Sequence, residues 1–329
     1  MKALVYTAPL ESRVMDVDAA KAEEGESVVD VAFCGICGSD MHAWHGHDDR
    51  RQPPLVLGHE AVGVVREGAM AGQRVAINPL MTCGACPACL RGQTHLCPTR
   101  EMIGMKKPGG FAEEVAIKSS NIFAIPDHLS FADAALAEPL ACCVHAVRLL
   151  THDYQDDHDS RMVVLGGGAI GLLSAMVAVA AGYRDVWIAE TNEMRRAMLE
   201  NCVDTKAYNP IDTAPTDRPI HYVLDAVGTG ITRKSSTELI TPGGMIVHIG
   251  LQDNDPGLDT RFITLQEVTF KGTYCYTDAD FAEAIDLLAK GTITGAGFTE
   301  IRPLADGASG FLDIHHGKAP PKIILDTSC

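Results

Sequence analysis

The spacing of apolar and polar residues changes near residue 140 and divides the chain into two kinds of structure. In the first part, short β-branched stretches are interrupted by Gly, Pro and Asp, which predicts a compact β-rich unit. Its expected strands lie within ESVVDVAFCGICGSD (26–40), PLVLGHEAVGVVREG (54–68), QRVAINPL (73–80), GGFAEEVAI (109–117) and NIFAIP (121–126).

From Arg161 onward, expected strands alternate with expected helices. The strands are MVVLG (162–166), DVWIAE (185–190), HYVLDAVG (221–228), GGMIVHIGL (243–251) and EVTFKGTY (267–274), and the helices between them include AIGLLSAMVAVAAG (169–182), NEMRRAMLENC (192–202) and TRKSSTELI (232–240). This alternation predicts a parallel sheet covered by helices on both faces, and therefore an α/β fold class. A helix over 278–291 and a strand over 322–326 complete the pattern.

Length and charge limit the classes of partner. The 329 residues suffice for about two domains. A formal net charge of −16 disfavours a nucleic-acid partner, which needs a positive surface, and also disfavours an anionic membrane. The longest apolar stretch, 169–181, has about 13 residues, fewer than the roughly 20 of a membrane span, and no secretory signal is visible. We therefore expect a cytoplasmic protein.

The glycine-rich segment 166–171 predicts a dinucleotide site. Gly166, Gly168 and Gly171 fit G-x-G-x-x-G between an expected buried strand and an apolar helix. Such glycines permit the tight turn, the close approach of a pyrophosphate and the packing of helix on strand. Glu190 ends the next strand, where a carboxylate binds a ribose and repels a 2′-phosphate, so NAD is favoured over NADP. Arg195 and Arg196 lie close behind it in the sequence.

Four of the eleven cysteines, Cys83, Cys86, Cys89 and Cys97, stand within fifteen residues. Their spacing, C-x2-C-x2-C-x7-C, suits four thiolates around one tetrahedral zinc ion. A ferredoxin-type iron–sulfur run needs three residues before its last cysteine, against seven here. Because thiolates would fill all four positions, we expect a structural zinc.

A second set of ligand types precedes this cluster. Cys37 lies in GICGSD, and His59 and Glu60 lie in GHE. A thiolate, an imidazole and a carboxylate are ligands of catalytic zinc, which keeps one position open for water or substrate.

These motifs occur together with AEPLACCVHA (137–146), and in combination they resemble zinc-dependent medium-chain alcohol and polyol dehydrogenases over nearly all of the chain. The carboxylate in EPL (138–140) is similar to the sorbitol, idonate and threonine dehydrogenase branch. The resemblance implies a GroES-like β-rich catalytic domain made of residues 1–140 and 274–329, with a zinc lobe at 83–97, and a Rossmann NAD-binding domain at 141–273.

The resemblance also implies roles for individual residues. Cys37 and His59 would bind the catalytic zinc, and Glu60 and Glu138 would share the remaining protein positions, directly or through water, with the choice left open. Ser39 would take the proton of the alcohol and His42 would pass it to solvent. The other implied cofactor contacts are Ile170, Arg195, Ile249, Gly250, Leu251, Thr273, Tyr274 and Cys275.

The implied reaction is hydride transfer from a secondary alcohol, such as a polyol or sugar acid, to NAD, with two zinc ions per chain in a homodimer or homotetramer. A non-catalytic NAD- and zinc-binding scaffold or redox sensor is the alternative. The family's arginine after KG is missing, since Tyr274 and Cys275 stand there, so the substrate stays open. Arg50 and Arg51, in the loop between the two zinc motifs, could meet an anionic group on a sugar phosphate or acid, but solvation is their expected role. Solvation is also the expected role of His315 and His316 in a late loop.

Overall fold

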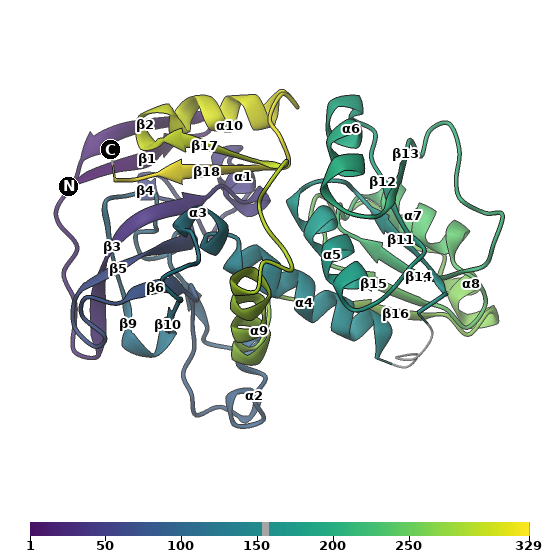
Figure 1. The fold of residues 1–329 in the computed structure, drawn as a ribbon, viewed down its shortest axis with the longest axis horizontal. Coiled ribbons are helices and arrows are strands. Elements are labelled where there is room, and N and C mark those ends of the chain that lie inside the picture. The colour runs from purple at the N-terminus through teal and green to yellow at the C-terminus, as the bar shows by residue number, and fades with distance from the viewer. Residues whose placement is uncertain (153–157, 329) are drawn as a thin grey trace. The chain divides into compact units, whose positions relative to one another are not determined.

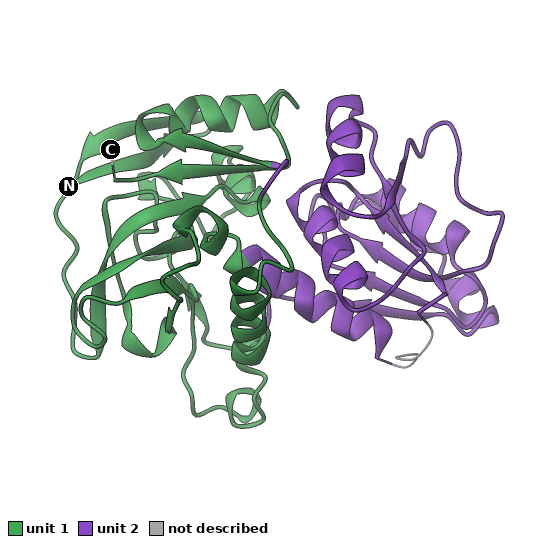
Figure 2. Cartoon of the chain, viewed as in Figure 1, with its two compact units in different colours: residues 1–138, 277–295, 299–329 green, residues 139–276, 296–298 purple. Residues whose placement is uncertain are grey.

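The computed structural model describes residues 1–152 and 158–328, and its internal contacts divide the chain into two compact units. Unit 1 contains residues 1–138, 277–295 and 299–329, and unit 2 contains residues 139–276 and 296–298 (Figure 2). Both ends of the chain therefore build unit 1, and the middle of the chain builds unit 2.

Unit 1 is organised around a seven-stranded sheet (Figure 1). Its strands run in the order β10 (Ile122–Ala124), β6 (Arg74–Ile77), β5 (Glu60–Glu67), β3 (Glu26–Gly35), β18 (Lys322–Asp326) and β17 (Thr299–Pro303), and β9 (Glu114–Lys118) also pairs with β3. A three-stranded sheet has the order β2 (Glu11–Asp16), β1 (Lys2–Ala8) and β4 (Leu55–Val56), and β7 (Leu80–Met81) pairs with β8 (Glu101–Met102).

The pairing of β18 with β3 matters most for the site. The two strands are antiparallel, with Leu325 opposite Cys34 and Ile324 opposite Gly35. The last strand of the chain is thereby held beside the strand that leads into GICGSD. Both strands are largely buried, which explains their near-continuous apolar sequence.

The helices of unit 1 are short except for α9. They are α1 (Gly38–Trp44), α2 (Pro87–Leu90), α3 (Phe131–Ala134), α9 (Asp278–Ala289) and α10 (Gly307–His315), with 3₁₀ turns η1 (Thr94–Leu96), η2 (Ser119–Asn121) and η3 (Leu304–Asp306). Trp44 of α1, Phe311 of α10 and Phe111 are buried in one core with side chains of β1, β3 and β5. The helix α4 (Ala137–Thr151) begins in unit 1 and continues in unit 2.

Unit 2 is a six-stranded parallel sheet with helices packed on it. The strand order is β13 (Lys206–Tyr208), β12 (Val186–Ala189), β11 (Arg161–Leu165), β14 (Ile220–Asp225), β15 (Met245–His248) and β16 (Thr269–Gly272), and the helices are α5 (Ala169–Ala180), α6 (Glu193–Cys202), α7 (Gly230–Leu239) and α8 (Thr260–Leu265). The order 3-2-1-4-5-6 is that of a Rossmann fold. All its strands are parallel, and the order in which the chain adds them to the sheet reverses between β11 and β14. The α/β prediction is confirmed.

Several elements were not predicted from the sequence: β1, β2, β13, β17, α8 and α10. The strand β13 has only three residues, too few to show a period, and it forms by pairing with β12. The helix α10 contains two glycines, which disfavour a helix, but its buried Phe311 anchors it to the core of unit 1. His315 is consequently the last residue of a helix, and the expectation of a loop there was wrong.

Within the described residues, none of the helices combines the length and apolar character needed to cross a membrane.

Candidate active site

Three ligand-type side chains of unit 1 converge where β3 ends and β5 begins. Cys37 is the N-cap residue of α1, His59 precedes β5, and Glu60 is the first residue of that strand. One ligand atom of each lies within 4.8 Å of the others. His59 is 3% and Glu60 1% exposed. The sheet pairing of β3 with β5, which sets Gly35 opposite Glu60, places residues from two motifs about twenty positions apart at one point.

The chemistry of this group fits zinc. Oε1 of Glu60 is buried without a hydrogen-bond donor among the described residues, whereas Oε2 is paired with Lys322, and a buried carboxylate is costly unless it is paired or coordinates a metal. The ammonium group of Lys322, which is 2% exposed, forms an ion pair with Glu60 and donates to the carbonyl of Ile36. Gly35 leaves no room for a side chain, since its Cβ would stand 1.9 Å from Glu60 Oε2. Cys37 and His59 with this carboxylate would hold the ion.

Asp40, which the sequence reasoning did not select, supports two of these ligands. It is fully buried, its Oδ2 accepts from the backbone N–H of Cys37 at 3.0 Å, and its Oδ1 lies 3.3 Å from Nδ1 of His59. Burial raises the pKa of Asp40, but His59, Arg51 and the N–H of Cys37 together outweigh burial and lower it. A carboxylate behind a ligating histidine fixes the ring and its tautomer. The signal was available, because Asp40 stands three residues after Cys37, as in a capping box.

Ser39 lies beside the ligand group and is held by Arg51. Ser39 Oγ is 3.4 Å from Nε2 of His59. Arg51 is 2% exposed and donates to the carbonyls of Ser39, at 3.2 Å, and Gly104, at 3.0 Å, and to Asp48, at 2.9 Å. The expectation that Arg51 is solvated was therefore wrong. Arg50 is exposed and pairs with Asp48 at 2.8 Å.

The two other predicted catalytic residues are less closely joined to this group. His42 is half-buried on α1, and burial lowers the pKa of its imidazole, which favours the neutral form. Within residues 1–152 and 158–328, no direct hydrogen bond connects His42 to Ser39. Glu138 is 6% exposed in the first turn of α4 and lies outside the group of ligand atoms that are within 4.8 Å of one another.

The four clustered cysteines converge in the segment around α2. Their ligand atoms all lie within 4.8 Å of one another, and the sulfur–sulfur distances include 3.5 Å for Cys86–Cys89, 3.6 Å for Cys97–Cys83 and 4.0 Å for Cys83–Cys89. A disulfide needs about 2.05 Å, whereas thiolates about 2.3 Å from one tetrahedral ion stand about 3.8 Å apart. The cluster therefore has the dimensions of a zinc site.

The thiols of this cluster differ in acidity. The hydroxyl of Thr99 lowers the pKa of Cys97 to about 6, and burial raises the pKa of Cys89 to about 11. A bound zinc ion would deprotonate all four thiols, because the thiolate is the form that binds metal. This arrangement leaves no open position, so it can hold a lobe together but offers no site for substrate.

In unit 2, the glycine loop connects β11 to α5. Gly166 has φ +99°, a conformation that disfavours other residues. A Cβ on Gly171 would stand 1.8 Å from the carbonyl oxygen of Gly166, so only glycine permits this contact. Gly168 is different, because a Cβ there would meet nothing within 4 Å. Open space at Gly168, the N-cap residue of α5, is where a phosphate group meets the free N–H groups of a helix.

Glu190 faces back toward this loop from the end of β12. Its carboxylate accepts from the N–H groups of Gly167, at 3.1 Å, and Asn192, at 2.7 Å. Nε of Arg195 lies 3.5 Å from the same carboxylate, and Arg196 donates to the carbonyl oxygen of Glu190 at 2.8 Å. Arg196 is thus hydrogen-bonded within the protein, whereas Nε of Arg195 forms only this 3.5 Å ion pair and no hydrogen bond to a described residue.

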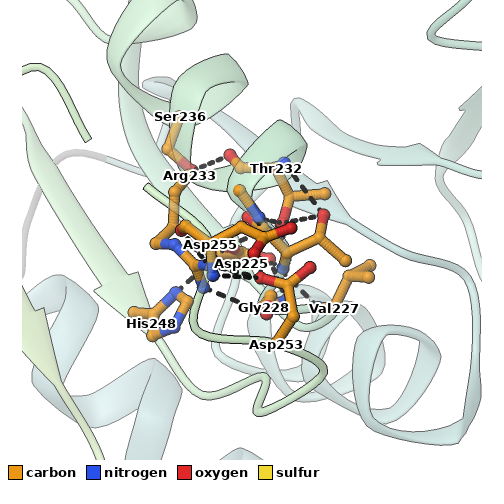
Figure 3. Close-up of polar contacts among 11 residues, drawn as sticks. Asp225, Val227, Gly228, Thr232, Arg233, Ser236, His248, Asp253 and Asp255 are labelled. Atoms are coloured by element: carbon orange, nitrogen blue, oxygen red, sulfur yellow. Dashed lines mark hydrogen bonds and ion pairs between the residues drawn. The ribbon is translucent and has the colours of Figure 1, made fainter. Parts of the chain in front are cut away.

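A buried aspartate organises the carboxyl ends of β14 and β15 (Figure 3). Asp225 is fully buried and accepts from the N–H groups of Val227 and Gly228 and from the hydroxyl of Thr232, at 2.9–3.0 Å. Its Oδ2 also lies 3.0 Å from Nδ1 of His248. The sequence reasoning missed this network, although DAVG ends an expected strand, and the structure ends that strand at Asp225. The effect of this network is to fix the loops that follow β14 and β15, and the second of these contains the predicted cofactor contacts Ile249, Gly250 and Leu251.

The remaining predicted cofactor residues occupy that same edge of the sheet or the loop at β11. Ile249 and Gly250 donate from their N–H groups to the carbonyl of Asp225, both at 3.0 Å. Leu251 is 72% exposed. Thr273, Tyr274 and Cys275 follow β16, Cys275 with φ +46°, and Ile170 lies in the first turn of α5. These predicted residues thus follow the carboxyl ends of β11, β15 and β16, at one edge of the parallel sheet.

Comparisons with known proteins agree with this architecture. Residues 23–127 match the model of the alcohol dehydrogenase GroES-like domain, and residues 169–290 match the zinc-binding dehydrogenase model. The chain is 33% identical to 2-dehydro-3-deoxy-L-galactonate 5-dehydrogenase of Pseudoalteromonas atlantica, over 99% of this chain and 98% of that one. It is 32% identical to D-arabitol-phosphate dehydrogenase of Enterococcus avium, over 92% and 90%.

A solved structure of similar fold is described as a short chain alcohol dehydrogenase of Escherichia coli complexed with NADH. It has a TM-score of 0.89 and 25% identity to this chain, and the match covers 99% of each. The chain belongs to the zinc-binding alcohol dehydrogenase family. It is a zinc-dependent alcohol oxidoreductase with a GroES-like domain and a Rossmann domain that uses a nicotinamide dinucleotide.

Proposed function

We propose that this dehydrogenase oxidises a secondary hydroxyl of an open-chain polyol that carries an anionic end group, foremost a sugar acid, and that it uses NAD. The observation that carries the proposal is the group formed by Cys37, His59 and Glu60, with Ser39 Oγ 3.4 Å from His59 Nε2. Oxidation of an alcohol requires metal ligands and a proton acceptor at one point, and this group of residues supplies both.

Cys37 and His59 would hold the catalytic zinc, with Glu60 or Glu138 in the remaining protein position. When bound there, zinc supplies Lewis-acid polarisation of the substrate hydroxyl, which lowers the pKa of that hydroxyl. Ser39 accepts the hydroxyl proton, and Arg51 holds the Ser39 backbone in place through its hydrogen bond to the carbonyl. His42, whose pKa is lowered by burial, is available as a neutral base that delivers the proton to solvent.

Lys322 gives Glu60 a second partner in the same pocket. Burial lowers the pKa of Lys322, but Glu60, Cys37 and Glu138 together outweigh burial and raise it, so the lysine stays protonated. Glu60 can therefore face either the ammonium group or the metal without becoming an isolated charge. This arrangement supports an exchange in which Glu60 and Glu138 alternate as ligands.

The preference for NAD rests on Glu190. Its carboxylate lies at the end of β12, next to the N–H of Gly167, where an adenosine ribose binds in Rossmann folds. A 2′-phosphate at this position would meet the negative charge of Glu190, while Arg196 is already hydrogen-bonded to the carbonyl of Glu190. Of the structurally similar dehydrogenases, one was solved with NADH and another, from Sinorhizobium meliloti, with NADP, so the preference rests on Glu190 itself.

The anionic end group is supported by the relatives. Two of them, at 33% and 32% identity, are named for a galactonate derivative and for a sugar-alcohol phosphate, both of which combine a polyol chain with a negative group. The match to the galactonate-derivative dehydrogenase covers 99% of this chain, and the match to the arabitol-phosphate dehydrogenase covers 92%. We therefore place sugar acids before sugar-alcohol phosphates.

The test is a steady-state screen of the zinc-loaded enzyme with NAD. The panel contains aldonates, the neutral polyols of equal length, and the matching polyol phosphates. We expect kcat/KM for the best aldonate to exceed that for the matching neutral polyol by roughly tenfold or more, because a charged group recognised in a pocket discriminates strongly. If the polyol phosphates have the highest kcat/KM, the anionic end group is a phosphate and not a carboxylate. If the neutral polyols have the highest kcat/KM, the proposal is overturned.

The proposal includes a cytoplasmic homodimer or homotetramer, as the family resemblance implies, and sedimentation velocity of the purified enzyme would measure the assembly state.

A further inference from the structure

A cluster of histidines lies on unit 1 apart from both groups of zinc-ligand residues. His45 follows α1 as its C-cap residue, His47 lies two residues further on, and His315 and His316 end α10. His45 is half-buried, and the other three side chains are exposed. None of them has a role in the proposed reaction. The cluster is open to solvent, so an ion could reach it.

The central pair has the geometry of two ligands of one metal ion. Nε2 of His45 lies 3.0 Å from Nδ1 of His315, although the residues are 270 positions apart. Imidazole nitrogens bind zinc at about 2.0–2.1 Å, so two that share one ion stand about 2.9–3.4 Å apart for bond angles between square and tetrahedral. The observed separation lies in this range, and one hydrogen bond between neutral rings gives the same separation.

Two further imidazoles flank the pair. The ring centre of His47 is 5.7 Å from that of His45, and the ring centre of His316 is 4.9 Å from that of His315. Zinc, copper and nickel favour such nitrogen ligands.

The surroundings hold the central rings in place. Trp44 is buried, and its ring centre lies 5.3 Å from that of His45 and 5.9 Å from that of His315. The same indole packs against Phe311, with 5.7 Å between ring centres, which fixes α10 beside α1. Packing against this apolar wall already restricts the rotamers of the two imidazoles. Binding of an ion therefore costs them less conformational entropy.

We propose that His45 and His315 bind a late first-row divalent cation, foremost Zn²⁺. Among the described residues no third ligand atom lies within 4.8 Å of both nitrogens, so His47 or His316 would have to rotate to reach the ion. The ion at this histidine clamp is distinct from the catalytic and structural zincs, since it shares no ligand with either. It joins the end of α1 to the end of α10. It thereby links the N-terminal and C-terminal segments of the chain that form unit 1. Because Cys37 is the N-cap residue of α1, the clamp holds the C-terminal end of the helix that carries Ser39 near its N-terminal end.

The first experiment counts zinc. The holoenzyme, with both tight sites filled, is dialysed against increasing free Zn²⁺ at pH 7.5, and bound zinc is measured by atomic absorption. We expect a third equivalent in the wild type and a loss of affinity of at least tenfold for it in both His45→Gln and His315→Gln. The control is His128→Gln, which changes an exposed histidine of unit 1 that is hydrogen-bonded to the carbonyl of Ala289. This variant should bind the third equivalent normally.

The second experiment measures stability. Added Zn²⁺ should raise the thermal midpoint of the wild type and of His128→Gln by roughly a few degrees, because a ligand that binds only the folded state stabilises it. The same addition should leave His315→Gln unchanged. His315 is exposed, so this variant decides the question even if His45→Gln folds poorly. Absence of a third equivalent in the wild type, or an unchanged affinity in His315→Gln, would overturn the proposal and leave the pair as a hydrogen bond.

Discussion

Asp40 and His59 form a buried pair behind the candidate zinc ligands, with 3.3 Å between Oδ1 and Nδ1. Asp40 also accepts from the backbone of Cys37. One carboxylate therefore positions an imidazole ligand and the loop that carries a thiolate ligand.

The first prediction removes the charge of that carboxylate. Asp40→Asn should weaken zinc binding at the catalytic site by roughly 10–100-fold, the usual effect of losing a group that orients a ligating histidine. The measurement is zinc content after dialysis against graded chelator. Asp280→Asn is the control, because Asp280 is equally buried but its carboxylate accepts from the N–H and hydroxyl of Thr277, the N-cap residue of α9. Equal zinc retention in the two variants would show that Asp40 does not support the ligands.

The second prediction separates proton transfer from metal binding. Ser39→Ala leaves Cys37, His59 and Glu60 intact and should keep two zinc ions per chain. Its kcat should fall roughly 10²–10⁴-fold near neutral pH, the usual contribution of general acid–base catalysis. Ser309→Ala, which changes a serine hydrogen-bonded to the carbonyl of Asp306 on α10, should leave kcat unchanged. Wild-type kcat in a two-zinc Ser39→Ala enzyme would assign the proton to another group.

The third prediction concerns the four-cysteine cluster. Cys89→Ser should remove one zinc ion and lower the thermal midpoint, while the folded fraction keeps its catalytic zinc, because the two ligand groups share no residue. Zinc analysis and calorimetry measure both effects. Cys202→Ser, which alters a cysteine of unit 2, should retain both ions. A Cys89→Ser protein with two zincs and the wild-type midpoint would exclude a structural zinc here.

The fourth prediction tests the cofactor preference. Glu190→Ala removes the carboxylate that faces the glycine loop, so the ratio of kcat/KM for NAD to that for NADP should fall by roughly tenfold or more from the wild-type value. The matched control, Glu193→Ala, removes an exposed carboxylate on the first turn of α6 and should keep the wild-type ratio. A wild-type enzyme that used NADP as well as NAD would contradict the role of Glu190.

The fifth prediction concerns acid stability in unit 2. Burial raises the pKa of Asp185, but the hydrogen bond from the buried Arg161, at 2.9 Å, and the Trp187 N–H outweigh burial and lower it. A carboxyl whose folded-state pKa is lowered contributes stability that is present above its unfolded-state pKa of about 3.9 and is lost as the pH falls through the folded-state pKa. The contribution of Asp185 should therefore be complete at pH 7 and vanish in strong acid.

Asp185→Asn measures this contribution. At pH 7 it should lower the free energy of unfolding by about 3 kcal/mol, since it leaves a buried arginine short of a partner. The difference from wild type should shrink below about pH 4. Asp159→Asn, which breaks the exposed 2.7 Å pair with Arg184, should cost at most about 1 kcal/mol at any pH. Urea titrations at several pH values give both quantities, and a pH-independent difference for Asp185→Asn would refute the assignment.

The chain by itself determined the chemistry that depends on short spacings. Four cysteines within fifteen residues and a glycine loop after a buried strand each place their groups through local backbone geometry, and neighbouring residues suffice for that. GICGSD and GHE showed the types of ligand, but the pairing of β3 with β5 brought them together. The alternation of strands and helices likewise predicted the α/β class and the parallel sheet of unit 2, because period and length are local properties.

Only the tertiary structure decided which distant residues meet. Lys322 reaches Glu60 because β18 pairs with β3, and His45 meets His315 because α10 packs on Trp44. Arg51 looked like a solvated loop residue until the chain around Ser39 and Gly104 enclosed it. Such contacts join segments that are far apart in the sequence, so no local period or spacing signals them; they form when burial of apolar side chains brings those segments together.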